Sequence, residues 1–281
     1  MKISEALKNA TEILQKSGIE ESRREANSLL RFALQKDKTF LIAHDNYLLN
    51  EKEEAFFQEI TERRASREPF QYILGRQEFF GLNFIVTPDV LIPRPETELI
   101  VENALEILSS KENSLFCEVG IGSGCISVSI LHEMKSASAL GLDISEKALE
   151  IAAENAEKHS VIERLRLEQS DVFTALNDEK FDLIVSNPPY IASKDIFGLQ
   201  PEVRDYEPLN ALTDGENGLS IIERIIKQSP LFLKSGGVIL IEIGFEQSSA
   251  VESFFDREIW QAVEFLYDLQ EIPRTVKAIL Q

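Results

Sequence analysis

Two short motifs combine residue types suited to holding a nucleotide-like ligand and a planar amine. The first is Glu118-Val-Gly-Ile-Gly-Ser-Gly124, which ends an apolar run and precedes a helical stretch. Glycines permit a tight turn there and let a ligand approach the backbone amides at a helix N-terminus. Dinucleotide enzymes have similar turns, and such a turn can be purely structural. On its own this motif therefore indicates a ligand site only weakly.

Two carboxylates end the next apolar runs. Asp143 lies nineteen positions after Gly124, where a carboxylate can accept hydrogen bonds from both hydroxyls of a ribose. Asp143 could instead cap the helix that begins after Ser145. Asp171, in QSDVF, could accept from an adenine amino group with Val172 against the ring, or it could be an ordinary loop carboxylate.

The second motif, Asn187-Pro188-Pro189-Tyr190, directly follows the apolar run FDLIVS. Two prolines fix the local backbone and remove two N–H donors, which leaves outward-facing carbonyls. The Asn187 side chain adds an acceptor and a donor, and the Tyr190 ring adds a stacking face. The Asn187 oxygen and the Pro188 carbonyl can thus accept the two hydrogens of a planar NH2 group. A plain turn would rarely combine these four residues.

The charge distribution argues against a nucleic-acid partner. The chain has 29 basic and 48 acidic residues, a net charge of −19. Residues 1–72 are nearly neutral, with 12 basic and 13 acidic side chains, whereas residues 73–281 hold 17 basic and 35 acidic ones. A phosphate backbone would be repelled by this second part, since nucleic-acid affinity depends on Lys and Arg contacts. A neutral or basic protein partner would not be.

Several other functional classes lack their sequence signals. Cys117 and Cys125 are too few for a disulfide framework, and the three scattered histidines lack zinc-ligand spacing, so no metal is expected. The first fifteen residues are amphipathic with no continuous apolar core, unlike a secretory signal. No apolar run reaches the ~18 residues of a membrane span. We therefore expect a cytoplasmic protein that does not bind membranes. We also expect a monomer, although none of these signals bears on the oligomeric state.

The apolar pattern predicts an α/β protein with a small helical bundle at its N-terminus. Residues 1–68 repeat apolar positions at helical spacing. From residue 114, short apolar runs alternate with helical stretches, which is typical of a parallel, doubly wound sheet. The expected strands are 114–119, 138–143, 164–169, 181–186 and 236–243, with 260–267 and 275–280 as a possible antiparallel pair at the sheet edge.

The same pattern suggests where the domains divide. Phe70 to Val90 is rich in aromatic and β-branched residues and is punctuated by Gly75 and Gly81, as in a hairpin. The two prolines and the acids of IPRPETE suit the start of a helix. We expect a helical domain at 1–69, a β-hairpin linker at 70–95 and an α/β domain at 96–281.

GIGSG, Asp143 and NPPY together resemble S-adenosylmethionine-dependent methyltransferases with the Rossmann-like fold. NPPY is typical of those that methylate a planar nitrogen. More narrowly, the chain resembles the HemK/PrmC family of protein-glutamine N5-methyltransferases, which modify peptide chain release factors. The long matching stretches are EFFGLNFIVTPDVLIPRPETELIVE at 78–102, PEVRDYEPLNAL at 201–212 and DGENGL at 214–219.

This resemblance covers nearly the whole chain. It implies a mostly parallel seven-stranded sheet, S-adenosylmethionine as cofactor, and release factors as substrates recognised by the N-terminal helical domain. The cofactor residues that it implies are Gly120, Ile121, Gly122, Ser123, Gly124, Asp143, Asp171, Val172 and Asn187. The glutamine amide would be held by Asn187, Pro188, Pro189 and Tyr190, with Asn187, Pro188 and Tyr190 catalytic, and Arg94 and Glu96 would line the entry or brace the cofactor end.

The chain departs from the family pattern at three positions. Glu118 stands where Asp is commoner, Ile121 where a small hydroxyl residue is commoner, and Val172 where some relatives have an aromatic residue. Two other functions compete with the methylation of glutamine. An adenine-N6 methyltransferase acting on DNA or RNA would share NPPY, although the charge and the lack of a basic target domain count against it. A non-catalytic cofactor-binding or adaptor protein would not need an intact NPPY.

Overall fold

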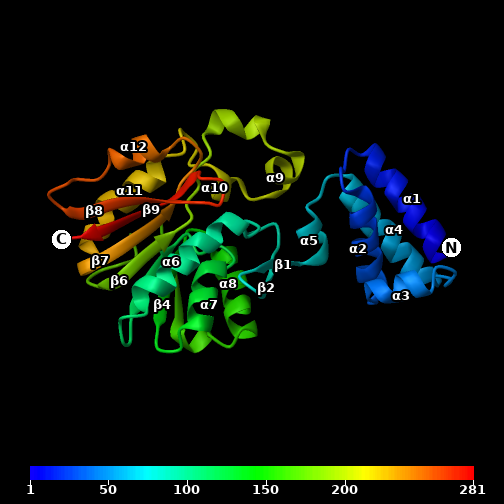
Figure 1. Ribbon diagram of the computed structural model, residues 1–281, viewed down its shortest axis with the longest axis horizontal. Coiled ribbons are helices and arrows are strands. Elements are labelled where there is room, and N and C mark those ends of the chain that lie inside the picture. The colour runs from blue at the N-terminus through cyan, green and yellow to red at the C-terminus, as the bar shows by residue number, and fades with distance from the viewer. The chain divides into compact units, whose positions relative to one another are not determined.

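The computed structural model describes residues 1–281 and divides into two compact units (Figure 1). Unit 1 comprises Met1–Gly75 and Gln200–Tyr206, and unit 2 comprises Arg76–Leu199 and Glu207–Gln281. No helix in either unit is both long and apolar enough to cross a membrane.

Unit 1 is a bundle of helices around one apolar core. Each long helix turns an apolar face inward, and the buried core includes Ile3, Leu30 and Phe57. A segment distant in sequence completes the unit, because the Glu202 carboxylate accepts hydrogen bonds from two arginines of the first 75 residues. The helices are α1 (Ile3–Lys16), α2 (Ser22–Leu34), α3 (Lys38–Ala43), α4 (Glu51–Ala65), α5 (Phe70–Leu74) and α9 (Pro201–Tyr206).

The segment after Pro69 is only partly the expected hairpin. Helix α5 occupies its first five residues, and the hairpin of β1 (Arg76–Phe79) and β2 (Leu82–Ile85) follows. Within the expected linker at 70–95, the hairpin therefore begins at Arg76, after a short helix that the sequence pattern did not indicate. Pro69 precedes the first turn of α5, and Gly75 ends it with a φ of 67°, a conformation that glycine adopts without strain. These end signals outweighed the aromatic and β-branched composition.

Unit 2 is built on a mostly parallel seven-stranded sheet, as expected. The strand order is β5-β4-β3-β6-β7-β9-β8; neighbours from β5 to β7 are parallel, and β9 is antiparallel to both β7 and β8. The strands are β3 (Leu115–Val119), β4 (Ser138–Asp143), β5 (Leu165–Gln169), β6 (Phe181–Ser186), β7 (Leu233–Glu242), β8 (Trp260–Tyr267) and β9 (Pro273–Leu280). The C-terminal pair forms the predicted antiparallel edge.

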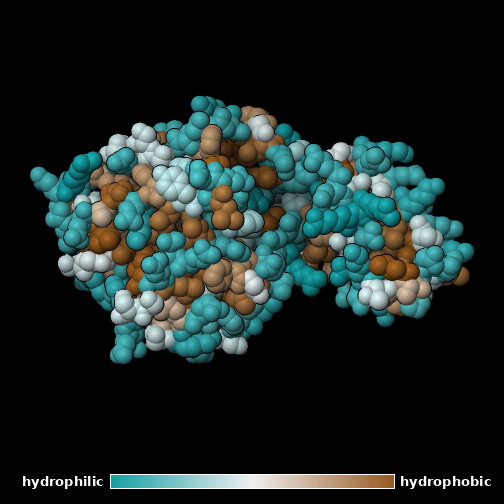
Figure 2. All heavy atoms as spheres, in the orientation of Figure 1, coloured by the Kyte–Doolittle hydropathy of each residue, from teal (hydrophilic) through white to brown (hydrophobic).

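Helices cover both faces of this sheet. Alternate strand residues point to opposite faces, so Phe116 and Leu183 pack with α6, α7 and α8, while Cys117 and Ile184 pack with α11 and α12. Figure 1 shows α6, α7 and α8 side by side in front of the strands, and Figure 2 shows hydrophilic residues over much of the visible surface. The long helices are α6 (Glu98–Leu108), α7 (Cys125–Glu133), α8 (Glu146–Lys158) and α11 (Ser220–Gln228); the shorter ones are α10 (Leu209–Leu212), α12 (Ser248–Glu252), η1 (Pro95–Thr97), η2 (Ile162–Arg164), η3 (Ser193–Gly198) and η4 (Ser229–Leu231).

The connection order reverses at β3. Strand β4 follows β3 in the chain and lies on one side of it, whereas β6 lies on the other side. The loops after these parallel strands leave the same edge of the sheet and diverge, which opens a crevice at that point. GIGSG, Asp143 and NPPY all lie at this edge, immediately after or at the end of their strands.

One buried side chain joins the hairpin to the glycine loop. Asn155 of α8 is fully buried, accepts from the Ile85 N–H at 2.7 Å and donates to the Ile85 carbonyl at 3.0 Å. Its amide nitrogen also donates to the Ser123 carbonyl at 2.9 Å. The Asn155 amide therefore pairs with β2 much as a neighbouring strand would, and it holds the loop that follows β3.

Asn155→Ala should lower the free energy of unfolding by about 2–4 kcal/mol, because it leaves buried backbone groups of Ile85 and Ser123 without partners. Urea denaturation measures the loss. The matched control is Asn103→Ala, since the Asn103 side chain donates only to the Leu99 carbonyl of its own helix. Its effect should stay within about 0.5 kcal/mol. Equal losses in the two variants would contradict the role given to Asn155.

Candidate active site

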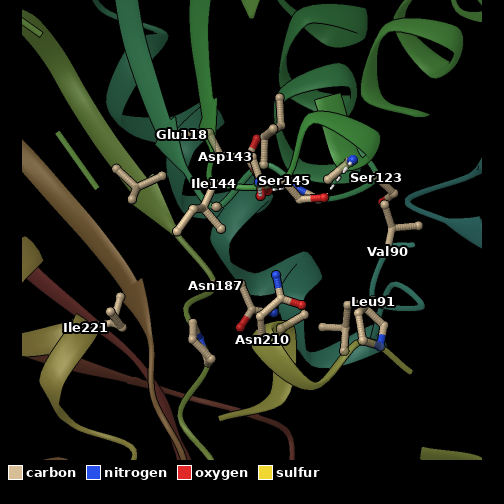
Figure 3. A pocket seen from close by; sticks show the side chains of 18 of the residues that line it. Val90, Leu91, Glu118, Ser123, Asp143, Ile144, Ser145, Asn187, Asn210 and Ile221 are labelled. Atoms are coloured by element: carbon tan, nitrogen blue, oxygen red, sulfur yellow. Dashed lines mark hydrogen bonds between the residues drawn. The ribbon is translucent and has the colours of Figure 1, made fainter. Parts of the chain in front are cut away.

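A cavity of about 420 Å³ opens at the carboxyl edge of the sheet in unit 2. Figure 3 shows Glu118, Asp143 and Ser145 on one side of it and Asn187, Asn210 and Leu91 on the opposite side. Its volume lies within the range of about 300–1,000 Å³ that is usual for small-molecule sites. The two motifs that the sequence singled out thus face each other across one space.

Most of the predicted site residues line this cavity. These are Arg94, Gly120, Ile121, Gly122, Ser123, Asp143, Asp171, Val172, Asn187 and Pro189. Gly124, Pro188, Tyr190 and Glu96 are not among the lining residues. Glu96 is exposed on the first turn of η1, and the other three pack next to residues that line the cavity.

Asp143 is a buried carboxylate that anchors the glycine loop. One of its oxygens accepts from the Gly122 N–H at 2.9 Å and the other from the Ser145 N–H at 2.9 Å. The side-chain cap of α8 is the Ser145 hydroxyl, which accepts from the Ala148 N–H. Burial raises the pKa of Asp143, although these backbone hydrogen bonds oppose the shift. A carboxylate has about four acceptor positions, so Asp143 can also accept from a ligand.

The glycines of the loop differ in what they do. Gly120 and Gly122 have positive φ angles of 74° and 54°, and a side chain on either would point into open space. Gly124 also has a positive φ, but a Cβ there would lie 3.3 Å from the Cβ of Ala152 in α8. The first two glycines therefore shape the cavity wall, and Gly124 permits α7 and α8 to pack closely.

Ile121 fits because of a residue in the neighbouring strand. Its side chain is 2% exposed and lies over Gly141 of β4, where a Cβ would come within 2.3 Å of the Ile121 Cδ1. The larger residue at 121 is thus accommodated by the absence of a side chain at 141.

Asp171 and Val172 lie on another wall of the cavity. Asp171 is half exposed and pairs with Arg224 of α11, with 3.0 Å between Oδ1 and Nη1. Val172 has a φ of 55°, which is rare for a β-branched residue. The Ser170 hydroxyl donates to the Val172 carbonyl at 2.9 Å and stabilises this turn. The strained turn leaves the Val172 side chain 6% exposed.

The NPPY loop is held from behind by side chains that do not belong to the motif. The Asn187 Nδ2 donates to the Thr97 Oγ1 at 3.1 Å, and the Tyr190 hydroxyl donates to a carboxylate oxygen of Glu242 at 3.3 Å. The Tyr190 carbonyl accepts from Gln247 at 2.9 Å. A Cβ at Gly218 would lie 2.1 Å from that carbonyl, so DGENGL supplies a glycine where the two loops touch.

The motifs IPRPETE and YEPLNAL meet through one ion pair. Arg94 donates to the carboxylate of Glu207, whose side chain is 1% exposed, and the other oxygen of Glu207 accepts from the Ile92 N–H at 3.2 Å. Arg94 is therefore held in the cavity wall by a residue more than a hundred positions away. Nothing in YEPLNAL by itself indicates this role for Glu207.

Three further residues of the site were missed. Thr97 and Glu242 are each 2% exposed, and they connect with Asn187 and Tyr190. A signal for Glu242 was present, since it is an acid at the end of the apolar run VILIE, and a buried carboxylate normally has a structural or chemical partner. Nothing in the local sequence indicates that Gln247 contacts Tyr190.

Glu118 is a second buried carboxylate in the cavity wall. It is 1% exposed and accepts from the Ser127 N–H, in the first turn of α7, at 2.9 Å. Burial raises the pKa of Glu118 to about 8, while the hydrogen bond from Ser127 opposes that shift. A glutamate here spans the distance from the end of β3 to the start of the helix.

The arrangement can therefore hold two ligands side by side. Asp143 and the open backbone of the glycine loop suit a ligand with a ribose, and the Asn187 oxygen has no partner within the chain. No group of three or more His, Cys, Asp or Glu side chains could hold a metal ion.

Comparison with known proteins agrees with this geometry. Residues 5–75 match the PrmC N-terminal domain, and residues 110–263 match a methyltransferase domain. The chain is 43% identical over 244 residues to a release factor glutamine methyltransferase of Geobacter sulfurreducens, covering 87% of this chain and 84% of that one. It is 36% identical over 281 residues to one of Clostridium acetobutylicum, covering 99% of each. A methyltransferase from Pyrococcus furiosus shares the fold, with a TM-score of 0.52 and 16% identity over 72% of this chain and 90% of that chain.

Replacing Glu118 should change how stability depends on pH. Its folded-state pKa of about 8 lies above the ordinary value of 4.5. The protonated carboxyl thus stabilises the fold fully below about pH 4.5, and this contribution is lost as the pH rises towards 8. Glu118→Gln cannot titrate and keeps an acceptor for Ser127. Between pH 5.5 and 8.5, the melting temperature of Glu118→Gln should therefore fall less than that of the unchanged protein. Each kcal/mol of difference between the two proteins in the free energy of unfolding corresponds to about 2–4 °C.

Scanning calorimetry at the two pH values measures this difference. Glu154→Gln, at an exposed position of α8, is the control and should follow the unchanged protein. Parallel pH profiles for the unchanged protein and Glu118→Gln would show that Glu118 has an ordinary pKa.

Proposed function

The chain belongs to the release factor glutamine methyltransferase family, and we propose that its cavity brings S-adenosylmethionine together with the glutamine of a release-factor Gly-Gly-Gln motif. The enzyme transfers a methyl group to the N5 atom of that glutamine. The observation that carries this proposal is the pairing of Asp143 and the glycine loop with Asn187 across one cavity. Methylation of adenine is not favoured, since these relatives are named for release factors.

The residues of the cavity fit the cofactor. Gly120 and Gly122 offer open backbone, Asp143 has spare acceptor positions for ribose hydroxyls, and Val172 offers an apolar surface for the adenine ring. We infer that Asp171, which lines the same cavity, accepts from the adenine amino group. When bound, S-adenosylmethionine supplies a methyl group on a positively charged sulfur.

The substrate amide needs orientation more than it needs a base. An amide nitrogen is a poor nucleophile because its lone pair is delocalised into the carbonyl. The Asn187 Oδ1 and the Pro188 carbonyl accept its two N–H groups, and the Tyr190 ring packs along its plane. Orientation of this kind can contribute on the order of 7–11 kcal/mol in the best intramolecular models. The nitrogen loses its proton after methylation, when it is positively charged and acidic, so no side chain of the motif serves as base.

The remaining expectations extend this proposal to the whole chain. Residues 1–69 recognise the release factor, residues 70–95 link the two parts, and residues 96–281 form the methyltransferase domain. The enzyme acts as a cytoplasmic monomer and takes no nucleic-acid substrate. The excess of acidic residues after position 72 supports the last point. Sedimentation at micromolar concentration tests the monomer.

Tritiated S-adenosylmethionine offered with release factor, with DNA, or with buffer alone tests the reaction. We expect label only with release factor, and mass spectrometry of the tryptic peptide should place one added methyl group on the glutamine. Label on adenine without label on glutamine would contradict the proposed function.

Asn187→Ala removes the proposed acceptor for the substrate amide. Its single-turnover rate at saturating release factor should fall by about 10² or more, since small misplacements of a reacting group carry such costs. The dissociation constant for the cofactor should change much less. Asn187→Asp keeps an acceptor but adds a charge and loses the donor to Thr97. A normal rate in Asn187→Ala, or a defect explained entirely by lost cofactor binding, would remove Asn187 from this role.

Asp143→Ala should weaken binding of S-adenosylmethionine by about 1–3 kcal/mol, the cost of leaving ribose hydroxyls without partners. Calorimetric titration measures the affinity. Asp171→Ala is the comparison, because Asp171 is half exposed and should matter less. Thermal unfolding of each variant shows whether the loop that Asp143 anchors has loosened. Unchanged affinity in Asp143→Ala would leave Asp143 only its bonds to Gly122 and Ser145.

A further inference from the structure

A buried chain of hydrogen bonds runs behind the two polar side chains of NPPY. The Asn187 Nδ2 donates to the Thr97 Oγ1 at 3.1 Å, and the Thr97 hydroxyl donates to Glu242 at 2.7 Å. The other oxygen of Glu242 accepts from the Tyr190 hydroxyl at 3.3 Å. Thr97 comes from η1 and Glu242 from the end of β7, so elements far apart in the sequence support one loop.

The direction of this chain follows from the chemistry of its members. An ionised carboxylate only accepts hydrogen bonds, so the single proton of the Thr97 hydroxyl points to Glu242. The Thr97 oxygen then has only lone pairs left for Asn187. An asparagine amide has two ends of similar size, and only its NH2 end can donate. Thr97 therefore turns the nitrogen of Asn187 towards itself and leaves the oxygen for the cavity.

Tyr190 is fixed by the same carboxylate. Burial, and then the neighbouring Glu242, raise the pKa of the Tyr190 hydroxyl, so it stays protonated and donates. A carboxylate can accept from Thr97 and Tyr190 at once, one on each oxygen. A glutamine at 242 has one acceptor oxygen and one NH2 group, so it could serve only one of them in the same way.

We infer that Thr97 and Glu242 are positioning residues for methyl transfer, which orient the Asn187 amide and the Tyr190 ring from a single buried carboxylate. This inference rests on the proposed function of Asn187. Neither residue needs to touch the reacting atoms. The Asn187 oxygen faces the substrate only while the Thr97 hydroxyl accepts from the Asn187 nitrogen.

The protonation state of Glu242 bears on this arrangement. Burial raises the pKa of Glu242 to about 7, opposed by the hydrogen bonds from Thr97 and Tyr190. Protonation would make one of its oxygens a donor, which conflicts with donation from Thr97 or Tyr190. The titratable and charged groups around it are Tyr190 of the NPPY loop, Glu96 of η1, Arg274 of β9 and Cys125 of α7. We therefore expect the single-turnover rate to fall as the pH drops below about 7. In Glu242→Gln the rate should no longer show this fall at low pH.

Three variants distinguish a positioning role of the Thr97 hydroxyl from a role of Thr97 in packing alone. Thr97→Val keeps the shape and removes the hydroxyl, and its single-turnover rate should fall by roughly 10- to 100-fold, since orientation is lost. The cofactor dissociation constant and the KM for release factor should change little. Thr97→Ser keeps the hydroxyl and should retain most of the rate. Thr275→Val is the matched control, because Thr275 is fully buried in the same sheet and its hydroxyl has no partner.

A double variant tests whether Thr97 acts through Asn187. In an Asn187→Ala background, Thr97→Val should slow the reaction no further. A normal rate in Thr97→Val beside a slow Asn187→Ala would overturn the inference and leave the proposed function intact. Equal damage in Thr97→Ser and Thr97→Val would also overturn it, since the hydroxyl would then be irrelevant. Absence of glutamine methylation by the unchanged enzyme would instead mark failure of the proposed function.

A measurement without turnover tests the same contact. In ¹⁵N NMR spectra, the side-chain NH2 signal of Asn187 is identified by its loss in Asn187→Ala. Its hydrogens should exchange slowly with solvent in the unchanged protein and in Thr97→Ser, and faster in Thr97→Val. Exchange that is equally fast in all three proteins would contradict the hydrogen bond on which the inference depends, whatever the enzyme methylates.

Discussion

The reversal of strand order at β3 is the constraint on which the site depends. Parallel strands bring their carboxyl ends to one edge, and the reversal makes the loops after β3 and β6 diverge there. The glycine loop, Asp143 and NPPY all come to this edge because each ends a strand. In an extended chain these residues would lie far apart. The sheet brings them together around a single cavity.

Buried acids hold that edge together. Glu118 bonds to the first turn of α7, Asp143 to the glycine loop, Glu207 to Arg94 and Glu242 to Thr97 and Tyr190. A carboxylate out of water is costly unless its oxygens have partners, and each of these has at least one. Some of the chain's acidic residues are thus buried and stabilise the fold, while others lie on the surface. At Glu118 and Glu242, burial outweighs the opposing hydrogen bonds and raises the pKa of the carboxyl group.

The long sequence stretches outside the two motifs supply residues that hold the walls of the site in place. IPRPETE supplies Arg94 and Thr97, YEPLNAL supplies Glu207, and DGENGL supplies the glycine that lies against the Tyr190 carbonyl. These contacts give each of the three stretches a structural role beside NPPY. Each depends on one residue type at one place, such as Gly218, where a Cβ would overlap the carbonyl.

The sequence by itself determined the fold class, the seven strands and the two motifs, because apolar periodicity and turn residues act over a few neighbouring positions. The hairpin-like composition after Pro69 did not indicate the short helix at Phe70–Leu74, which ends at Gly75. Only the tertiary structure decided that Asn187 meets Thr97, that Arg94 meets Glu207, and that Gly141 makes room for Ile121. These partners lie on different strands and loops, and no local pattern records which side chains the sheet brings within hydrogen-bond distance.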